Sequence, residues 1–343
     1  MSKVRNWSRD PWRHSVEFDA LFQGRSGNDI NGLGETEHRQ PNQVFWLQPS
    51  GNGPFGAVQD CVVERHNSVP ELLEVYAHAQ RGPSMREVEA AAHDTPGVSR
   101  SAEQWTDDVR AYALAHESDQ VGITAVDPDW MYAGFESDLP FVIVLVITMD
   151  HQRSAQLPPT AEHHEWPHEV AAQYNRGSRA ARNLTKWIKE QGFRGKPHTG
   201  PWVSSMNLLP AAIAAGIGEL GKHGSLINRQ LGSSFRLAAV ETDMPLLSNT
   251  ANRFGADEFC LGCQVCTNAC PPQAIGKEKQ MVRGVQKWYV DFDKCIGYFN
   301  ETFGCAICIA VCPWSTPGRA PNLAERWTKR IKLTNQDTVD SND

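Results

Sequence analysis

The chain has no long apolar run and no excess of positive charge. Its longest apolar stretch, residues 139–149, has 11 residues between Asp138 and Asp150. A helix needs about 20 apolar residues to cross a bilayer, so we expect no membrane span. The β-branched content of the stretch instead favours a buried strand. The formal net charge of -7 argues against the basic surface that nucleic-acid binding requires, so no nucleic-acid partner is expected.

The first residues also lack the marks of an export signal. They contain neither a twin arginine nor an apolar segment, which are the features that direct secretion. We therefore expect a cytoplasmic protein. In that compartment thiols stay reduced, so clustered cysteines are expected to bind metal rather than to form disulfides.

Cysteine is the residue type with the most uneven distribution. Eight of the nine cysteines lie within one 53-residue stretch. They form two runs that each end before a proline, namely Cys260, Cys263, Cys266 and Cys270, then Cys295, Cys305, Cys308 and Cys312. The first run has the C-x2-C-x2-C-x3-C-P spacing, in which three thiolates hold one cluster and the fourth ligates the other. The second run is the same module with a longer first gap.

This spacing predicts two 4Fe-4S clusters that exchange their fourth ligands. The first cluster would be bound by Cys260, Cys263, Cys266 and Cys312, and the second by Cys295, Cys305, Cys308 and Cys270. A pair of zinc sites is the alternative, but zinc does not call for a third evenly spaced cysteine followed by proline. Disulfides fit less well, because cysteines three residues apart on a tight loop suit a metal better than each other.

Composition divides the chain into four segments. Residues 1–66 are rich in Gly, Pro and Asn and predict an irregular arm that packs on the body of the protein. Residues 67–250 alternate helical and strand signals, which indicates an α/β (α+β) domain of two or three layers. Residues 251–316 hold the eight cysteines and are too few to form an apolar core, so the clusters must organise this part. The polar residues 317–343 predict a disordered tail.

Local patterns predict elements within these segments. The arm has two apolar islands, at 44–47 and 57–63, where we expect short strands. In the central segment the patterns predict helices over 70–79 and 102–116 and strands over 120–127, 141–149 and 235–243.

Residues 168–193 have a 3.6-residue apolar period that predicts one long helix. One stripe of this helix holds Tyr174, Gly177, Ala181, Leu184 and Ile188, and Gly192 ends it. One interpretation is an ordinary core-facing helix with a half-buried tyrosine. The other is that Gly177, which costs about 1 kcal/mol relative to alanine in a helix, leaves room beside Tyr174 for a flat ligand.

Residues 207–247 are dense in glycine and contain a formal G-x-G-x-x-G over residues 216–221. A dinucleotide-binding fingerprint must follow a strand and open a helix. Here the preceding residues are helix-forming and the following ones contain too many helix breakers, so we expect no nicotinamide site. The glycines, with polar Ser233, Ser234 and Arg236 nearby, instead favour close contact between the backbone and a large cofactor.

The chain resembles the catalytic subunit of cobalamin-dependent reductive dehalogenases over residues 67–316. The resemblance depends on the order of four blocks, which are YNRGSRAARNLTKWIKEQGF, LPAAIAAGIGELGKHGSL, GSSFRLAAVETDMPL and the two cysteine runs. It implies a nitroreductase-like domain over 67–250 that binds a corrinoid. It also implies a bacterial-ferredoxin-like domain over 251–316 that holds two 4Fe-4S clusters.

The resemblance also implies roles for particular residues. Tyr174 matches the tyrosine proton donor of the family by position, and either Arg236 or Lys222 would be the basic residue beside it, with Arg236 favoured by its order in the chain. Corrinoid contacts are implied for the glycine-dense block, at Asn207, Gly218, Gly221, His223, Gly224, Gly232, Ser233 and Ser234. Three aromatic residues between the second-run cysteines are expected to wall a substrate pocket, namely Tyr298, Phe299 and Phe303.

The expected activity is therefore the reductive dehalogenation of an organohalide, with an external ferredoxin, flavodoxin or reductase as electron donor. One alternative is an epoxyqueuosine reductase, which resembles this chain in using cobalamin with two such clusters. Against it, only 31 residues follow Cys312, too few for the helical-repeat tail with which that enzyme grips tRNA, and the net charge is acidic. The other alternative is a non-enzymatic electron-transfer or corrinoid-handling protein.

Overall fold

A four-stranded antiparallel sheet forms the centre of the protein, in the strand order β1-β2-β6-β3. The computed structural model describes residues 12–48, 53–77, 82–91 and 99–340. The strands are β1 (Gln120–Ala125), β2 (Phe141–Thr148), β6 (Phe235–Thr242) and β3 (Gly195–His198). The three strands predicted from the sequence are thus confirmed. The edge strand β3 was not predicted, because Pro197 interrupts its short pattern.

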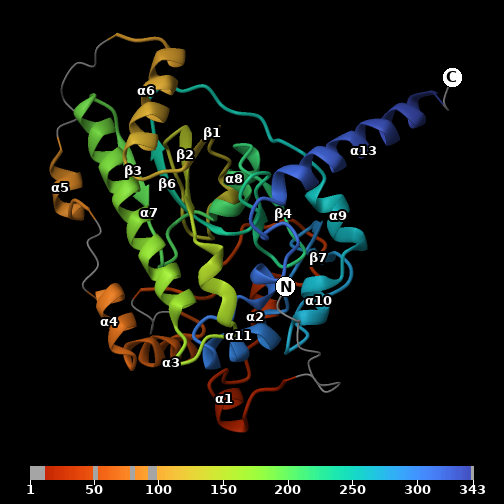
Figure 1. Cartoon of the computed structure of the whole chain (residues 1–343). Helices are drawn as coiled ribbons and strands as arrows, with labels where there is room; N and C mark the ends of the chain where they lie inside the picture. The colour runs from red at the N-terminus through yellow and green to blue at the C-terminus, as the bar shows by residue number, and fades with distance from the viewer. Residues whose placement is uncertain (1–11, 49–52, 78–81, 92–98, 341–343) are drawn as a thin grey trace.

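The sheet is covered on both faces, as Figure 1 shows with α7 on one side and α8 on the other. Along β2, alternate side chains enter two different cores. Ile143, Leu145 and Ile147 pack under α7 (Glu165–Glu190), whereas Val142, Val144 and Val146 pack under α8 (Leu208–Ala214). Because neighbouring strand residues point to opposite faces, a run that is apolar throughout indicates a strand buried on both sides, as observed here.

The helices predicted in the central segment are present with small differences in their bounds. The first is α4 (Pro70–Ala77), and the second is α6 (Ala102–Ala115), which begins with a capping box at Ser101. The long helix α7 ends just before Gly192, whose φ of +90° is left-handed. Three further short helices in this segment are α5 (Met85–Ala90), η2 (Pro128–Trp130) and η3 (His151–Gln156).

The glycine-dense block forms a short hairpin after α8. Its strands are β4 (Glu219–Leu220) and β5 (Leu226–Ile227). The formal G-x-G-x-x-G therefore follows a helix and enters a strand. This is the reverse of the order that a dinucleotide fingerprint needs, and it agrees with the expectation of no nicotinamide site.

The strands predicted in the N-terminal arm are wrong. Residues 57–63 lie in α3 (Gly56–Asn67), and residues 44–47 have no regular structure. Val58 and Val62 are one helical turn apart and pack in one apolar cluster with Ile296 of the cysteine segment. A short apolar island fits both the 3.6-residue period of a helix and the two-residue period of a strand. Here packing against the cysteine segment favours the helix. The other helices of the arm are α1 (Val16–Ala20) and α2 (Gly27–Asn31).

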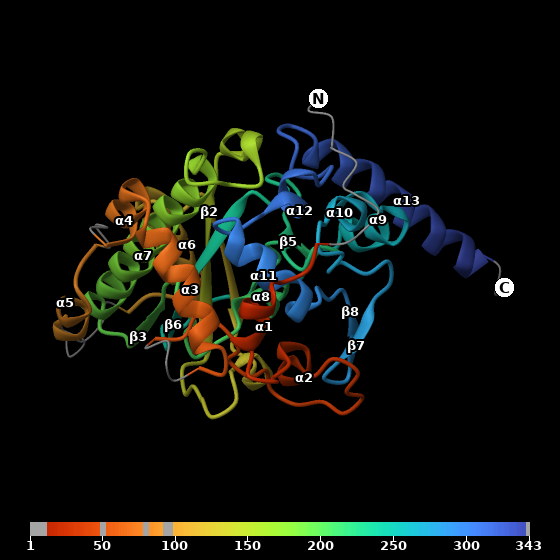
Figure 2. The same cartoon turned by 90° about the horizontal axis from the view of Figure 1, so that it is seen from below.

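The arm packs on the cysteine segment, as Figure 2 shows for α1, α2 and α11. Asp293 accepts hydrogen bonds from the Ser26 hydroxyl at 2.6 Å and from the Gly27 backbone N–H at 2.7 Å. The cysteine segment consists of α9 (Ala256–Gly262), α10 (Val265–Ala269), the hairpin β7 (Gln280–Val282) and β8 (Val285–Lys287), α11 (Phe292–Glu301) and α12 (Ile307–Ala310).

The disordered tail predicted for the last residues is also wrong. Residues 320–340 form one helix, α13 (Ala320–Asp340). Ala320 and Ala324 are buried against Phe254 and Trp314 of the cysteine segment. A polar helix of this kind is stabilised by its partner surface rather than by its own pattern. Across the described ranges no helix has the length and apolar character that crossing a bilayer requires.

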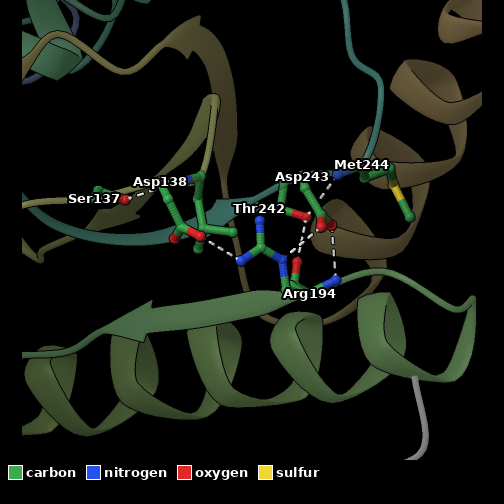
Figure 3. A network of polar contacts seen from close by, with 7 residues as sticks. Ser137, Asp138, Arg194, Thr242, Asp243 and Met244 are labelled. Carbon is green, nitrogen blue, oxygen red and sulfur yellow. Dashed lines mark hydrogen bonds and ion pairs between the residues drawn. The ribbon is translucent and has the colours of Figure 1, made fainter. Parts of the chain in front are cut away.

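A polar network holds the end of the sheet together (Figure 3). Arg194, just before β3, donates to Asp243 from its Nε and from its backbone N–H, both at 2.7 Å. Its Nη1 donates to Asp138 at 2.6 Å, in the segment before β2. The Thr242 hydroxyl donates to the Arg194 carbonyl at 2.7 Å. The network joins three chain segments and anchors β3, which leads directly into the cavity described below.

The contact between the glycine-dense hairpin and the cysteine segment generates a testable prediction. At Gly232, φ is +62° and a Cβ would lie 2.2 Å from the Trp314 carbonyl oxygen. At Gly134, φ is +86° and a Cβ would meet nothing within 4 Å. Both alanine substitutions incur the left-handed strain of about 1 to 2 kcal/mol, but Gly232→Ala adds a collision worth about 1 to 3 kcal/mol. Thermal melts of oxygen-free protein should show the larger loss for Gly232→Ala, and equal losses would contradict the packing.

Candidate functional site

The structure brings thiols of the two cysteine runs close together, and their spacing assigns them to a first set of Cys260, Cys263, Cys266 and Cys312 and a second set of Cys295, Cys305, Cys308 and Cys270. In the first set, burial and the nearby thiols of Cys312, Cys266 and Cys263 together raise the pKa of Cys260 to about 12. In the second, burial raises the pKa of Cys308 well above its usual value, and the thiols of Cys305, Cys295, Cys270 and Cys266 act in the same direction. Cys312 thus lies near the first run and Cys270 near the second, and the assignment of each thiol to one cluster stays a prediction.

The surroundings of the thiols fit cluster binding. Backbone N–H groups point at two of the sulfurs, from Lys222 to Cys260 Sγ at 3.5 Å and from Ala274 to Cys270 Sγ at 3.3 Å. Such N–H groups stabilise the negative charge of cluster sulfurs. Within the described ranges, no three His, Cys, Asp or Glu side chains converge closely enough to hold a single ion. The four thiolates of a cubane bind four different iron atoms, so they need not converge on one point.

Lys222 lies beside the first cysteine set. Its side chain is 1% exposed, and its Nζ donates to the Cys263 carbonyl at 2.7 Å and lies 4.8 Å from the Trp288 ring centroid. A positive charge at this point would favour electron uptake by a cluster bound to these cysteines, because local charge sets cluster potentials. The structure thus places Lys222 with Cys260 and Cys263 and not with Tyr174.

A cavity of about 870 Å³ lies between α7, α4, β6 and the segment that joins Cys295 to Cys305. This volume is near the upper end of the range for small-molecule sites. Its aromatic lining comprises Trp46, Tyr76, Trp166, Tyr174, Trp202, Phe299 and Phe303. Phe299 and Phe303 thus line the cavity as predicted. Tyr298 does not, because it is buried with Ala269 and Ile307 behind the cavity wall.

Tyr174 and Arg236 meet in this cavity. Arg236 projects from β6, and its Cζ lies 5.2 Å from the centroid of the Tyr174 ring, which comes from α7. The Arg236 Nε is buried without a hydrogen-bond partner. Gly200 also contacts this ring, because a Cβ on Gly200 would lie 2.1 Å from Tyr174 Cδ1. Gly200 therefore lets the chain press against the ring. No sequence pattern indicated this, because the contact joins a loop to a distant helix.

The remaining stripe of α7 faces the sheet and not a ligand. Ala181, Leu184 and Ile188 are buried in the core between α7 and the sheet. A Cβ on Gly177 would lie 3.4 Å from Ala238 and Ile147, which is ordinary packing distance. The interpretation that Gly177 leaves room for a flat ligand is therefore wrong. The core-facing interpretation holds for this stripe, and only Tyr174 turns to the cavity.

The eight residues expected to contact a corrinoid do not belong to the cavity lining of the described chain. Asn207 caps α8 through its Oδ1. At Gly218 a Cβ would lie 2.4 Å from the Ile227 carbonyl oxygen, at Gly221 2.8 Å from the His223 ring, and at Gly224 2.9 Å from Val290, whereas Gly232 abuts Trp314. These glycines are thus required by packing within the hairpin and against the cysteine segment.

The polar members of the group are engaged within the protein. Burial lowers the pKa of His223 to about 4, and its Nε2 lies 3.2 Å from the Ser233 hydroxyl. The Ser233 backbone N–H donates to Ser315 at 3.2 Å, and the Ser234 hydroxyl lies 3.3 Å from His151 Nδ1. Corrinoid contact by these residues stays a prediction.

Sequence reasoning missed a buried acid–base pair beside the cavity. His198 on β3 and Glu241 on β6 are 1% and 0% exposed and share a short hydrogen bond. Burial raises the pKa of Glu241, but the hydrogen bond and charge of His198, with Ser137 and Lys196, bring it below its usual value. His198 Nδ1 lies 2.6 Å from the hydroxyl of Ser204, which lines the cavity. Because His198 and Glu241 lie on different strands and 43 positions apart in the chain, no local sequence pattern indicates the pair.

The exchange of ligands between the two cysteine runs gives a prediction about iron content. Cys270→Ala and Cys295→Ala should damage the same cluster, so their combination should keep about four iron atoms per chain. Cys270→Ala with Cys263→Ala should damage both clusters and leave almost none. Iron analysis and electron paramagnetic resonance of oxygen-free protein measure this. If the protein with Cys270→Ala and Cys295→Ala loses all its iron while the protein with Cys270→Ala and Cys263→Ala does not, the assignment of Cys270 to the second set is wrong.

Comparison with known proteins agrees with this architecture. Residues 259–316 match the 4Fe-4S dicluster domain. The tetrachloroethene reductive dehalogenase of Desulfitobacterium hafniense is 30% identical over 224 residues, which cover 61% of this chain and 38% of that protein. The epoxyqueuosine reductase of Leadbetterella byssophila is 33% identical over 143 residues, which cover 37% of this chain and 43% of that protein. The chain thus spans less than half the length of these curated relatives.

Two solved structures share the fold. A catabolic reductive dehalogenase aligns with a TM-score of 0.71 at 19% identity, over 92% of this chain and 49% of that one. A second reductive dehalogenase, whose structure suggests a mechanism for B12-dependent dehalogenation, aligns with a TM-score of 0.63, over 93% of this chain and 44% of that one. The expected fold class is therefore confirmed. Over part of its length the chain is a homologue of two groups of iron-sulfur reductases, the reductive dehalogenases and the epoxyqueuosine reductases, and it carries a ferredoxin-like dicluster domain.

Proposed function

We propose that this protein reductively dehalogenates an organohalide at a cobalamin cofactor that receives electrons through two 4Fe-4S clusters. One observation carries the proposal. The cavity that contains Tyr174 and Arg236 has part of its wall built by Phe299, Phe303 and Gly304, which lie between two cysteines of the second set. A proton donor and an electron source thus face the same space.

The reaction converts R–X, two electrons and one proton into R–H and halide. A bound corrinoid would supply a cobalt centre able to store both electrons for reduction of the carbon–halogen bond. The resemblance assigns corrinoid contacts to the glycine-dense block, where Gly232 and Ser233 pack against Trp314 and Ser315 of the cysteine segment and line no part of the cavity. An external ferredoxin, flavodoxin or reductase would deliver the electrons singly to the cysteine segment.

The proposed role of Tyr174 is to donate the proton. A phenol holds its proton at neutral pH, so the difficulty lies in stabilising the phenolate that remains after transfer. Arg236 is placed for this, with its Cζ 5.2 Å from the ring centroid. At an effective dielectric of about 20, a unit charge at that distance contributes roughly 3 kcal/mol. Arg236 carries this charge without a carboxylate partner among the described residues, so little of its effect is neutralised.

The apolar lining supports the same chemistry by limiting water. Trp46, Trp202 and Phe299 line the cavity together with Tyr174. A cavity with few water molecules strengthens the interaction between Arg236 and the developing phenolate. It also favours transfer of the tyrosine proton to carbon over exchange with solvent.

Epoxyqueuosine reduction is the second candidate, supported by the 33% identity over 143 residues to an enzyme of that name. The two activities are separated by assaying both on the same preparation. We expect bromide release from 3-bromo-4-hydroxybenzoic acid, the ligand of a structural neighbour, or from another member of a phenolic and aliphatic halide panel. Conversion of epoxyqueuosine in tRNA, with no halide released from any member of the panel, would reject the dehalogenase proposal.

Tyr174→Phe tests the proton donor. The substitution removes one hydroxyl, so iron and corrinoid contents should stay at the level of the native protein, while halide release should fall about a hundredfold or more. Tyr112→Phe is the matched control, because Tyr112 stacks on His116 and Trp187 away from the cavity. Halide release that persists unchanged in Tyr174→Phe rules out the tyrosine as the acid.

Arg236→Gln tests the charge beside Tyr174. Loss of roughly 3 kcal/mol of phenolate stabilisation corresponds to a decrease in kcat of about a hundredfold. Arg236→Lys should retain part of the activity, since it keeps the charge but not the planar group. Arg229→Gln serves as the control, because Arg229 is exposed and packs on Phe254. Equal activities of the two glutamine variants would show that Arg236 has no electrostatic role.

A further inference from the structure

Helix α7 carries three arginines at intervals of three residues, and one of them differs from the others. Arg176 pairs with Asp119 and Arg179 with Glu117, both at 2.7 Å. Arg182 has no carboxylate partner among the described residues. Its one hydrogen bond there is a long one, from Nη1 to the Pro83 carbonyl at 3.4 Å.

Arg182 turns into the cavity that also holds Tyr174 and Arg236. Its Nε is buried without a hydrogen-bond partner, as is that of Arg236. Burial lowers the pKa of Arg182, and no neighbouring acid acts in the opposite direction. A guanidinium that is partly desolvated and unpaired is costly to keep, so its retention in a cavity points to a ligand that compensates it.

The charge balance of the cavity has the same implication. Its lining contains two arginines and, among the described residues, no aspartate or glutamate. Burial lowers the pKa of His66, which also lines the cavity, and so disfavours a positive charge on that imidazole. The cavity is therefore positive, with aromatic walls, and fits an anion attached to an aromatic ring.

We propose that Arg182 binds the carboxylate of a halogenated aromatic acid and so determines which organohalides the cavity accepts. The inference rests on the proposed dehalogenase function, in which Arg236 serves Tyr174 and Arg182 has no part. Arg182 follows Tyr174 by eight residues, which is two turns or roughly 12 Å along the helix. The carboxylate would thus lie at one end of the cavity and the carbon–halogen bond near Tyr174 at the other. The planar guanidinium suits two parallel hydrogen bonds to a carboxylate.

Binding distinguishes this role from a structural one. The probes are 4-chlorobenzoate and 4-chlorobenzamide, which have the same shape but differ in charge, titrated by calorimetry into the cofactor-loaded protein. We expect the native protein to bind the acid at least tenfold more tightly, because a charge-assisted hydrogen bond contributes that much. Arg182→Gln should abolish the preference for the acid and leave the amide affinity unchanged, whereas Arg182→Lys should keep part of the preference. Arg176→Gln, which breaks only a surface ion pair, should keep the full preference.

Three results would overturn the proposal. The first is equal affinity for acid and amide in the native protein, and the second is a preference for the acid that survives in Arg182→Gln. The third is a loss of cobalamin binding in Arg182→Gln with unchanged binding of cobinamide, which lacks the nucleotide-loop phosphate. That result would assign Arg182 to the phosphate of the cofactor instead.

Halide release measured on the same samples separates this inference from the proposed function. Preferential binding of 4-chlorobenzoate without halide release from any member of the halide panel would reject the dehalogenase function and leave the carboxylate site standing. Halide release that is equally fast from charged and neutral substrates, in both the native protein and Arg182→Gln, would reject the carboxylate site and leave the function standing.

Discussion

The approach of the two cysteine runs to one another is the constraint on which the rest of the structure depends. Each cysteine run must fold back on the other, so the chain between Cys295 and Cys305 has to leave and return over a short distance. It does so as α11, which presents Phe299 to the cavity and Asp293 to the arm. The cysteine segment thus positions one wall of the cavity, and the N-terminal arm covers it from outside.

The cavity departs from the usual pairing of buried charges. Elsewhere on α7 and at the end of the sheet, arginines are matched with carboxylates, as at Arg179 and Arg194. In the cavity, Arg182 and Arg236 have no acid among the described residues to neutralise them. A folded protein tolerates such a cost where a ligand or a reaction intermediate recovers it. The two charges fit two different tasks, stabilising the phenolate of Tyr174 and binding the substrate.

Elements with strong local patterns were predicted well, and elements whose form depends on a partner were not. The continuous apolar run of β2 and the long period of α7 each admit one structure. The apolar island that holds Val58 and Val62 is compatible with either a strand or a helix, and its contact with Ile296 favours the helix. The C-terminal helix is polar along most of its length, so its pattern indicated disorder, and only burial of Ala320 and Ala324 against Trp314 explains why it folds.

The amino-acid sequence by itself determined that residues 259–316 form a 4Fe-4S dicluster domain, because the C-x2-C-x2-C-x3-C-P spacing is a local requirement of cluster ligation. It also predicted the strands and helices that carry Tyr174 and Arg236. Only the tertiary structure decided that these two side chains meet, that Lys222 lies with the first cysteine set, and that Gly200 and Arg182 belong to the cavity. The physical reason is that such contacts join residues from different elements, and the packing of those elements against each other produces no periodic pattern in the sequence.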